Sequence, residues 1–203
     1  MATGTSVDGL TRARERVLAT AYDLFARRGI RAVGVDEIVA SSRVAKATFY
    51  RHFPSKDDLV LAFLQRRERE WTWGLVEAGA RARGSTPLEQ LLAIFDVFDE
   101  WFARRDDFNG CSFINVLLEM GPEHRVGRAC IDYLANIRGI VHDWAAEAGL
   151  DDPDGFARSW HILMKGSIIS AAEGDTHAAR RAQRMAWWLI EDHRSSQSDS
   201  TLA

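Results

Sequence analysis

The sequence contains few of the residues that mark disulfide-linked, metal-binding or membrane proteins. Among 203 residues there are four prolines and two cysteines, Cys111 and Cys130. Two cysteines so far apart form neither a Cys-x-x-Cys redox pair nor a zinc site, so we expect free thiols and no metal. No apolar stretch approaches the ~18 residues of a membrane span. Residues 1–10 also lack the charge and apolar core of a secretory signal, so we expect a cytoplasmic protein with no membrane partner.

Catalytic sequence motifs are lacking as well. The chain has no Gly-x-Ser-x-Gly elbow, no Walker phosphate loop and no dinucleotide-binding glycine fingerprint. Histidines in the second half of the chain are scattered and do not place several ligands on one helical face. We therefore expect no catalytic residues and no cofactor, and we do not expect an enzyme.

The net charge is small but unevenly distributed. The whole chain carries a formal charge of −3. Residues 1–56 contain ten Lys or Arg against five Asp or Glu, whereas the remaining residues contain 16 against 24. A basic N-terminal segment on an acidic body is typical of a protein that presents one end to a polyanion. A chance asymmetry of solvated faces is the alternative that charge alone leaves open.

A short amphipathic helix is predicted within residues 44–56. At ~100° per residue, Ala45, Phe49 and Phe53 form one narrow apolar stripe, and Thr48 and Arg51 lie roughly opposite it. A second short helix is predicted at residues 35–41, with a tight turn at residues 42–44. Two short helices joined by so tight a turn indicate a helix-turn-helix, with the later helix as the DNA-reading element.

The stretch from Ala13 to Leu64 resembles the N-terminal domain of the TetR (tetracycline repressor) family of transcriptional regulators. Its landmarks occur in matching order and spacing: Ala21, Phe25, Gly29, Asp36-Glu37-Ile38-Val39, Thr48-Phe49-Tyr50-Arg51-His52-Phe53 and Ser55-Lys56-Asp57-Asp58-Leu59. Three positions depart from the usual pattern. Arg43 occupies a turn position where glycine is common, which predicts a modest left-handed strain. Gly34 and Ala45 stand where hydroxyl caps are frequent.

The resemblance implies which side chains meet DNA. Lys46, Ala47, Thr48 and Arg51 would face bases in the major groove, and Arg51 is suited to a bidentate contact to guanine. Tyr50 and Lys56 would hold phosphates; His52 would do the same or would pack at the helix edge. The fourth helix would direct its first backbone amides at a phosphate. The predicted DNA-binding residues are Arg43, Lys46, Ala47, Thr48, Tyr50, Arg51, His52 and Lys56.

Apolar spacing and Gly or Pro punctuation predict about nine helices and no strand. Their approximate ranges are residues 11–28, 35–41, 45–53, 55–82, 88–102, 111–120, 122–148, 153–172 and 176–193. We therefore predict an all-α fold, in the layout that the resemblance also implies. A helix-turn-helix domain at residues 1–56, with a flexible arm at 1–10, would precede a ligand-binding and dimerisation domain at residues 57–194. Residues 195–203 would form a disordered tail.

The predicted body is rich in aromatic residues, and all seven tryptophans follow Lys56. Any one of these rings is more often part of a core. In a family whose body encloses a ligand cavity, however, together they predict a pocket for an apolar or aromatic inducer. Residues 110–113 resemble a Gly-Cys-x-Phe feature near the pocket of one subgroup. We expect a packing thiol there rather than a redox trigger. The predicted ligand-binding residues are Trp71, Phe95, Phe98, Trp101, Phe102, Cys111, Phe113, Trp144, Trp160 and Met164.

The last two predicted helices should be antiparallel neighbours, because a very short link joins them. They carry apolar residues that a monomer would leave exposed, so we predict that they pair with their two-fold mates in a homodimer. The predicted interface residues are Ile168, Ala171, Ala178, Ala182, Met185, Ala186 and Leu189.

The sequence as a whole predicts a ligand-responsive, DNA-binding transcriptional regulator. We expect a repressor that is released from a palindromic double-stranded operator by a small apolar or aromatic molecule. The alternative is an orphan DNA-binding or interaction protein that keeps the fold without responding to a ligand.

Overall fold

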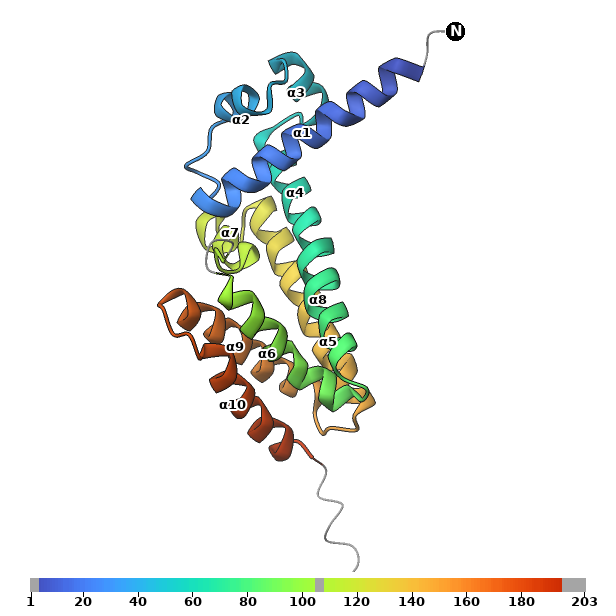
Figure 1. Cartoon of the computed structure of the whole chain (residues 1–203), viewed down its shortest axis with the longest axis vertical. Coiled ribbons are helices and arrows are strands. Elements are labelled where there is room, and N and C mark those ends of the chain that lie inside the picture. The colour runs from blue at the N-terminus through green and yellow to red at the C-terminus, as the bar shows by residue number, and fades with distance from the viewer. Residues whose placement is uncertain (1–3, 105–107, 195–203) are drawn as a thin grey trace, which may run out of the picture. The chain divides into compact units, whose positions relative to one another are not determined.

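The computed structural model describes residues 4–104 and 108–194, and these are helical almost throughout (Figure 1). Apart from one isolated backbone bridge between Leu150 and Arg194, the described residues contain no strand. The elements are α1 (Gly4–Arg28), α2 (Val35–Ser42), α3 (Lys46–His52), α4 (Lys56–Arg67), the π-helix η1 (Glu68–Glu77), α5 (Ala78–Arg83), α6 (Pro87–Ala103), α7 (Ser112–Met120), α8 (Arg125–Glu147), α9 (Pro153–Ala172) and α10 (Ala178–Asp192). None of the described helices is long and apolar enough to cross a membrane.

The predicted all-α fold is confirmed. Because α4, η1 and α5 follow one another without a break, the described residues contain nine separate helical runs. The start of the first helix differs from the prediction. The first helix begins at Gly4 rather than near residue 11, so most of the expected arm is helical. No proline interrupts residues 4–11, so the hydrogen-bonded ladder can continue toward the N-terminus. The expected tail at residues 195–203 lies outside the described residues.

The chain divides into two compact units, each built from two stretches of sequence. Unit 1 contains residues 1–68 and 111–132, and unit 2 contains residues 69–110 and 133–203. This division differs from the predicted boundary after residue 56. Helix α4 belongs with the N-terminal helices because Phe63 packs edge-to-face on Tyr22 and Phe25 of α1, with centroids 5.2 and 5.7 Å away. Leu59 of α4 is fully buried in the same unit.

Unit 1 is held at the turn after α1 by a carboxylate that is distant in sequence. Helix α1 ends at Gly29, which has a φ of +80° and donates its N–H to Phe25. The next two backbone N–H groups, of Ile30 and Arg31, both donate to the Glu119 carboxylate at the end of α7, the first at 2.8 Å. A Cβ on Gly29 would lie 3.1 Å from the same carboxylate. Glycine is therefore suited to this position both by its conformation and by its size.

The Glu119 contact predicts a specific loss of stability. Glu119→Ala removes a charged acceptor from two backbone N–H groups, which should cost ~1–3 kcal/mol in the free energy of unfolding. Urea unfolding followed by circular dichroism measures this difference. Glu123→Ala, an exposed glutamate three residues after Met120, is the matched control and should change stability little. Equal effects of the two substitutions would contradict the structural role of Glu119.

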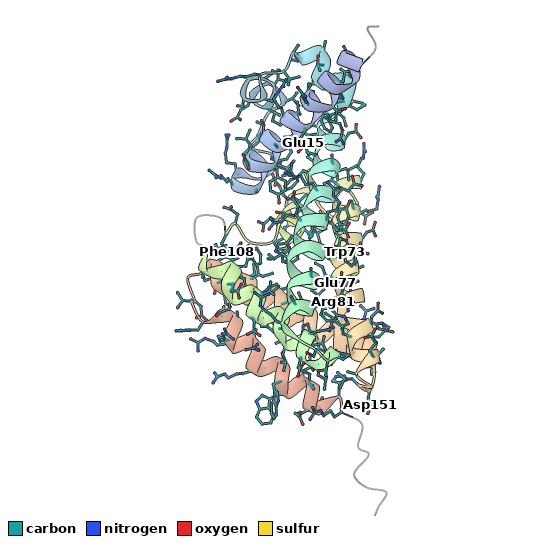
Figure 2. The ribbon with its side chains drawn as sticks, turned by 45° about the vertical axis from the view of Figure 1, so that its right-hand side comes forward. Glu15, Trp73, Glu77, Arg81, Phe108 and Asp151 are labelled. Atoms are coloured by element: carbon teal, nitrogen blue, oxygen red, sulfur yellow. The ribbon has the colours of Figure 1, made fainter. Side chains whose placement is uncertain are left out.

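Unit 2 contains the aromatic core. Rings from η1, α6 and α9 contact one another in an unbroken series: Trp71 lies 6.0 Å from Phe98, Phe98 lies 6.0 Å from Phe95, and Phe95 lies 5.3 Å from Trp160. Phe95, Phe98 and Trp160 are fully buried. Helix α6 begins with a capping box between Thr86 and Glu89 and with a proline in its first turn. Figure 2 shows Trp73, Glu77 and Arg81 following one another along one side of η1 and α5.

Helices α9 and α10 lie antiparallel (Figure 1). Ion pairs and hydrogen bonds hold α10 against α6. Arg180 binds Asp96 at 2.6 Å and Asp99 at 3.0 Å, and Gln183 donates to the Leu92 carbonyl and to Asp96. These contacts fix the rotation of α10 about its axis. Its small residues Ala178, Ala182 and Ala186 are therefore buried within the chain.

One titratable side chain, His161, is buried in unit 2 on α9. It is 4% exposed, and its Nδ1 has no hydrogen-bond partner among the described residues. Burial, together with the nearby Lys165 and Arg138 charges, lowers its pKa from 6.5 to about 3. The folded state therefore holds this imidazole neutral where an unfolded chain would protonate it.

The buried imidazole predicts a pH dependence. Between about pH 6.5 and 3 the unfolded state binds one more proton at His161 than the folded state does, so stability falls as pH falls. From pH 7 to pH 5 this group should remove ~2 kcal/mol. Urea unfolding at both pH values should show a smaller acid loss for His161→Leu than for the natural protein. The exposed His177, replaced by Leu, is the control; an unchanged pH profile in His161→Leu would refute the assignment.

Candidate DNA interface and ligand-binding unit

The helix-turn-helix of unit 1 is formed by α2, a three-residue turn and α3. Ile38 of α2 and Phe49 and Phe53, at the end of α3, are buried against α1. Arg43, in the turn, has φ 53° and ψ 44°, which confirms the predicted left-handed conformation. Relative to glycine this costs ~1 kcal/mol. The N-caps Gly34 and Ala45 make no side-chain cap hydrogen bond, so burial of the aromatic stripe must hold α3 in place.

The opposite side of α3 is open to solvent. Arg43, Lys46, Ala47, Tyr50 and Arg51 are exposed, whereas Thr48, His52 and Lys56 are half-buried. The eight residues predicted to meet DNA therefore lie in or beside one helix-turn-helix. The guanidinium of Arg51 has no hydrogen bond or ion pair among the described residues, so it is available to an external acceptor.

Two of the predicted DNA-contact residues have hydrogen-bond partners within the chain, and a third is half-buried. Lys46 binds Asp36 at 2.7 Å, and this contact raises the pKa of the lysine. Lys56 donates to the Ile30 carbonyl at 2.6 Å. The Nε2 atom of His52 is buried without a partner, and its ring lies 6.5 Å from that of Phe53. The half-buried His52 thus packs at the helix edge, one of the two alternatives that the sequence left open.

The start of α4 is fixed on the same unit. Ser55 accepts from the backbone N–H of Asp58 as an N-cap, and Arg125 binds the Asp58 carboxylate at 2.7 Å. Hydrogen bonds from Ser55 and then Arg125 lower the pKa of Asp58. The carboxylate of Asp57 lies 3.5 Å from His124. These contacts join the helix that follows α3 to the α7–α8 corner, residues 121–125.

The predicted ligand-binding residues do not form one set. Cys111 and Phe113 lie in unit 1, and the other eight lie in unit 2. Trp71, Phe95, Phe98, Trp101, Phe102 and Trp160 contact one another as core rings. Trp144 is separate from them, with the Arg81 guanidinium 5.1 Å from its ring centroid, and it lines a surface groove. The sequence identified the buried aromatic residues but not this groove.

Both cysteine thiols are free and buried, as predicted. Burial, and to a lesser extent the neighbouring Cys111, raises the pKa of Cys130 to about 12. Cys130 is therefore a poor nucleophile at neutral pH. The buried position of Cys111 agrees with a packing role for its thiol.

The predicted dimer face requires a correction. Ile168, Ala178, Ala182 and Ala186 are buried within the chain, while Ala171 and Leu189 are partly exposed and Met185 is 57% exposed. Helix α10 has two apolar sides, and its alanine side is covered by the chain itself. The large apolar side chains that α9 and α10 leave exposed are Ile162, Ile169, Met185, Trp187 and Trp188.

Comparison with known proteins agrees with this geometry. Residues 17–63 match the family model described as bacterial regulatory proteins, tetR family. A TetR-family transcriptional regulator from Streptomyces coelicolor superposes with a TM-score of 0.81 at 30% identity, covering 90% of this chain and 96% of the other. The transcriptional regulator AcuR of Cereibacter sphaeroides is 26% identical over 175 residues, or 78% of this chain and 76% of AcuR. The multidrug binding protein EbrR, complexed with malachite green, shares the fold with a TM-score of 0.68 at 19% identity, covering 87% and 97%.

The fold and the exposed cationic helix define a helix-turn-helix DNA-binding regulator. With a relative 30% identical over nearly its full length, the chain belongs to the TetR family of transcriptional regulators.

The two kinds of DNA contact should be separable by mutation. Arg51→Ala should cost about 1–3 kcal/mol at one base pair and relax sequence preference there. Lys56→Ala should weaken all duplexes about equally and reduce the slope of log affinity against log salt by about one unit. Fluorescence anisotropy with operator and random DNA over a salt series measures both. An equal loss on operator and random DNA for Arg51→Ala would show that Arg51 does not read a base.

Proposed function

We propose that the protein is a homodimeric repressor that binds a near-palindromic operator and is released from it by a small molecule. The observation that carries the DNA-binding half is the exposed side of α3, where Arg51 lies without an internal partner. A charge-assisted donor that is free in the protein can bind guanine without breaking an existing contact. Lys46 must exchange Asp36 for a base or phosphate, so it contributes less to net affinity.

The exposed apolar residues of α9 and α10 support the dimer. Ile162 is 69% exposed, Ile169 47%, Met185 57% and Trp188 69%. Apolar side chains gathered on two adjacent helices are the usual sign of an association surface. A two-fold axis there would pair both helices with their mates in a four-helix interface. Two copies of α3 would then present the same side chains to two half-sites of a palindrome.

The chemistry of unit 2 supports a response to a small molecule. Its aromatic core includes two polar atoms without a hydrogen-bond partner among the described residues, Thr72 Oγ1 and Trp160 Nε1. Such atoms are satisfied when a ligand with a polar group binds beside them. EbrR, which shares the fold, binds malachite green. By analogy, we propose that a small apolar or aromatic molecule binds unit 2 and lowers the affinity for the operator.

Repression is the simplest mode of action. A dimer that covers two successive major-groove half-sites within a promoter blocks access to that DNA without needing any other contact. A ligand that favours the conformation unable to engage both half-sites relieves the block by population shift. The rival function is an orphan DNA-binding protein that does not respond to a ligand.

One experiment separates the two functions. DNA flanking the chain's own gene is footprinted with the purified protein, and the protected fragment is titrated with and without a panel of small aromatic and apolar compounds. Regulation by ligand predicts protection of a two-fold symmetric site and a weaker Kd with at least one compound. By linkage, the operator must weaken the binding of that compound by the same factor. Protection that no compound alters would favour the orphan function.

The dimer surface predicts opposite outcomes for neighbouring positions on α10. Trp188→Glu places a charge on the exposed side and should give folded monomers that bind the palindrome poorly. Ala182→Glu places a charge in the buried side against α6 and should unfold the chain. Sedimentation velocity reports the oligomeric state, and circular dichroism reports folding. Leu118→Glu, at a 79% exposed apolar position on α7, is the control; an unchanged dimer in Trp188→Glu would place the interface elsewhere.

A further inference from the structure

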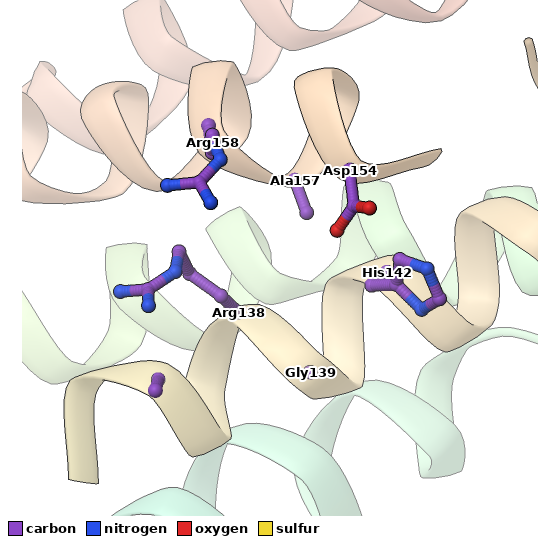
Figure 3. Close-up of a pocket in the computed structure, with 7 residues that line it drawn as sticks. Arg138, Gly139, His142, Asp154, Ala157 and Arg158 are labelled. Carbon is purple, nitrogen blue, oxygen red and sulfur yellow. The ribbon is translucent and has the colours of Figure 1, made fainter. Parts of the chain in front are cut away.

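Two surface grooves of unit 2 border the same stretch of α8. One has a volume of about 260 Å³ and lies between α8 and α9 (Figure 3). The other, of about 320 Å³, lies between α8 and the run formed by η1 and α5. Ala135 and Gly139 of α8 line both grooves. We call the two grooves together the α8 trough.

The groove between α8 and α9 holds two arginines without a carboxylate partner. Figure 3 shows Arg138 of α8 and Arg158 of α9 at one end of the groove, with Asp154 and His142 at the other. Arg138 donates to the carbonyl of Leu134 in its own helix at 3.4 Å. Arg158 has no hydrogen bond or ion pair among the described residues. Two guanidinium groups that lie at the same end of one groove, and that form no ion pair with a carboxylate, favour the binding of an anion between them.

The acids that line the trough do not supply that counter-ion. Glu77 binds Arg81 at 3.1 Å, and Asp143 contacts His142 at 3.0 Å. Asp154 lies in the first turn of α9, where the helix dipole stabilises a carboxylate. It forms no ion pair with Arg158, one turn further along, within the part of the chain that the structure describes. Arg138 and Arg158 therefore remain without a carboxylate partner at one end of the groove, and Asp154 lies at the other end.

The other groove supplies aromatic surface. Trp73, 40% exposed, lies in its lining together with Trp144 and Ile140. Trp73 and Arg81 lie on the same side of the run formed by η1 and α5 (Figure 2). The guanidinium of Arg81 covers the Trp144 ring at 5.1 Å. An arene that entered this groove would contact Trp73 directly and could stack on the Arg81 guanidinium plane.

Gly139 joins the two grooves and has no packing reason to be glycine. It lies in the middle of the 23-residue helix α8, where glycine is the least favourable residue after proline. Its φ is not in the left-handed region, and a Cβ placed on it would meet nothing within 4 Å. The missing side chain therefore leaves open space over the floor that both grooves share. Close approach of a ligand is a reason for such a glycine.

We propose that the α8 trough binds an arylcarboxylate, with its carboxylate between Arg138 and Arg158, its body over Gly139 and its ring beside Trp73. The guanidinium groups match a carboxylate in charge and in planar geometry. This inference gives a ligand class and a site in unit 2 that lies outside the aromatic core around Thr72 and Trp160, and an effector role for the trough rests on the proposed function. Binding to the trough does not itself depend on DNA.

The test is isothermal titration of the full chain, without DNA, with benzoate, cinnamate and 4-phenylbutyrate, each beside its uncharged amide. At least one acid should bind saturably and at least about tenfold more tightly than its amide, because the amide lacks the charge. Arg158→Gln and Gly139→Leu should each weaken that acid about tenfold or more. The control Arg184→Gln, at an exposed arginine of α10 outside the trough, should leave binding unchanged.

Gly139→Ala is the control that shows whether weaker binding in Gly139→Leu comes from a loss of folding. Because its Cβ meets nothing, this variant should melt no lower than the natural protein, and Gly139→Leu should share that melting behaviour. Absence of binding by all three acids, or equal binding in Arg158→Gln, would overturn the proposal. Inorganic phosphate that binds as tightly as the best acid would overturn the aromatic part. An acid that binds as described but leaves operator affinity unchanged would uphold the trough and refute its role as effector site.

Discussion

The carboxylate of Glu119 determines how unit 1 is assembled. It accepts hydrogen bonds from two successive backbone N–H groups after α1, while Lys56 donates to the carbonyl of the same turn. A helix terminus leaves such groups without partners inside the helix, and a charged acceptor is among the strongest ways to satisfy them. The turn between α1 and α2 is thereby bound to α7 and to the start of α4. Since α2 and α3 pack on α1, the orientation of the DNA-reading helix depends on this contact.

One side of helix α3 is buried, and this burial alone keeps the helix in place. The other side is exposed to solvent. It has seven residues and no side-chain N-cap, so its own propensity would not keep it folded. Phe49 and Phe53 supply the missing stability by being fully covered. On the exposed side, Arg51 has no partner among the described residues and Lys46 is paired to Asp36. A rigid scaffold with adaptable surface side chains is what base reading requires.

Local signals made much of this fold predictable. Helix α9 has the predicted bounds because Pro153 begins it and Glu173-Gly174 follows it, and Gly29 ends α1 for the same kind of reason. The Glu119 contact could not be predicted, because its backbone partners lie 88 and 89 residues away in sequence. The side of α10 that stays exposed was not predicted, because α10 has two apolar sides and a sequence does not say which one α6 covers. No proline or other helix-breaking signal in the sequence marks the π-helix η1, so the sequence predicted an ordinary α-helix there. The α8 trough needs three separate helical segments, and periodicity within any one of them does not reveal it.

The structure therefore separates two tasks within one helical chain. Unit 1 presents the cationic side of α3 on a scaffold that hydrogen bonds hold in place. Unit 2 contains an aromatic core, two arginines in one groove without a carboxylate partner, and exposed apolar side chains on α9 and α10. We propose that two copies of α3 read DNA together. Selection of bound sequences from a random double-stranded library tests this proposal. If it holds, the enriched motif has two inverted half-sites with centres about one helical turn, or ~10 base pairs, apart. Enrichment of a single half-site, of direct repeats or of no motif would contradict it.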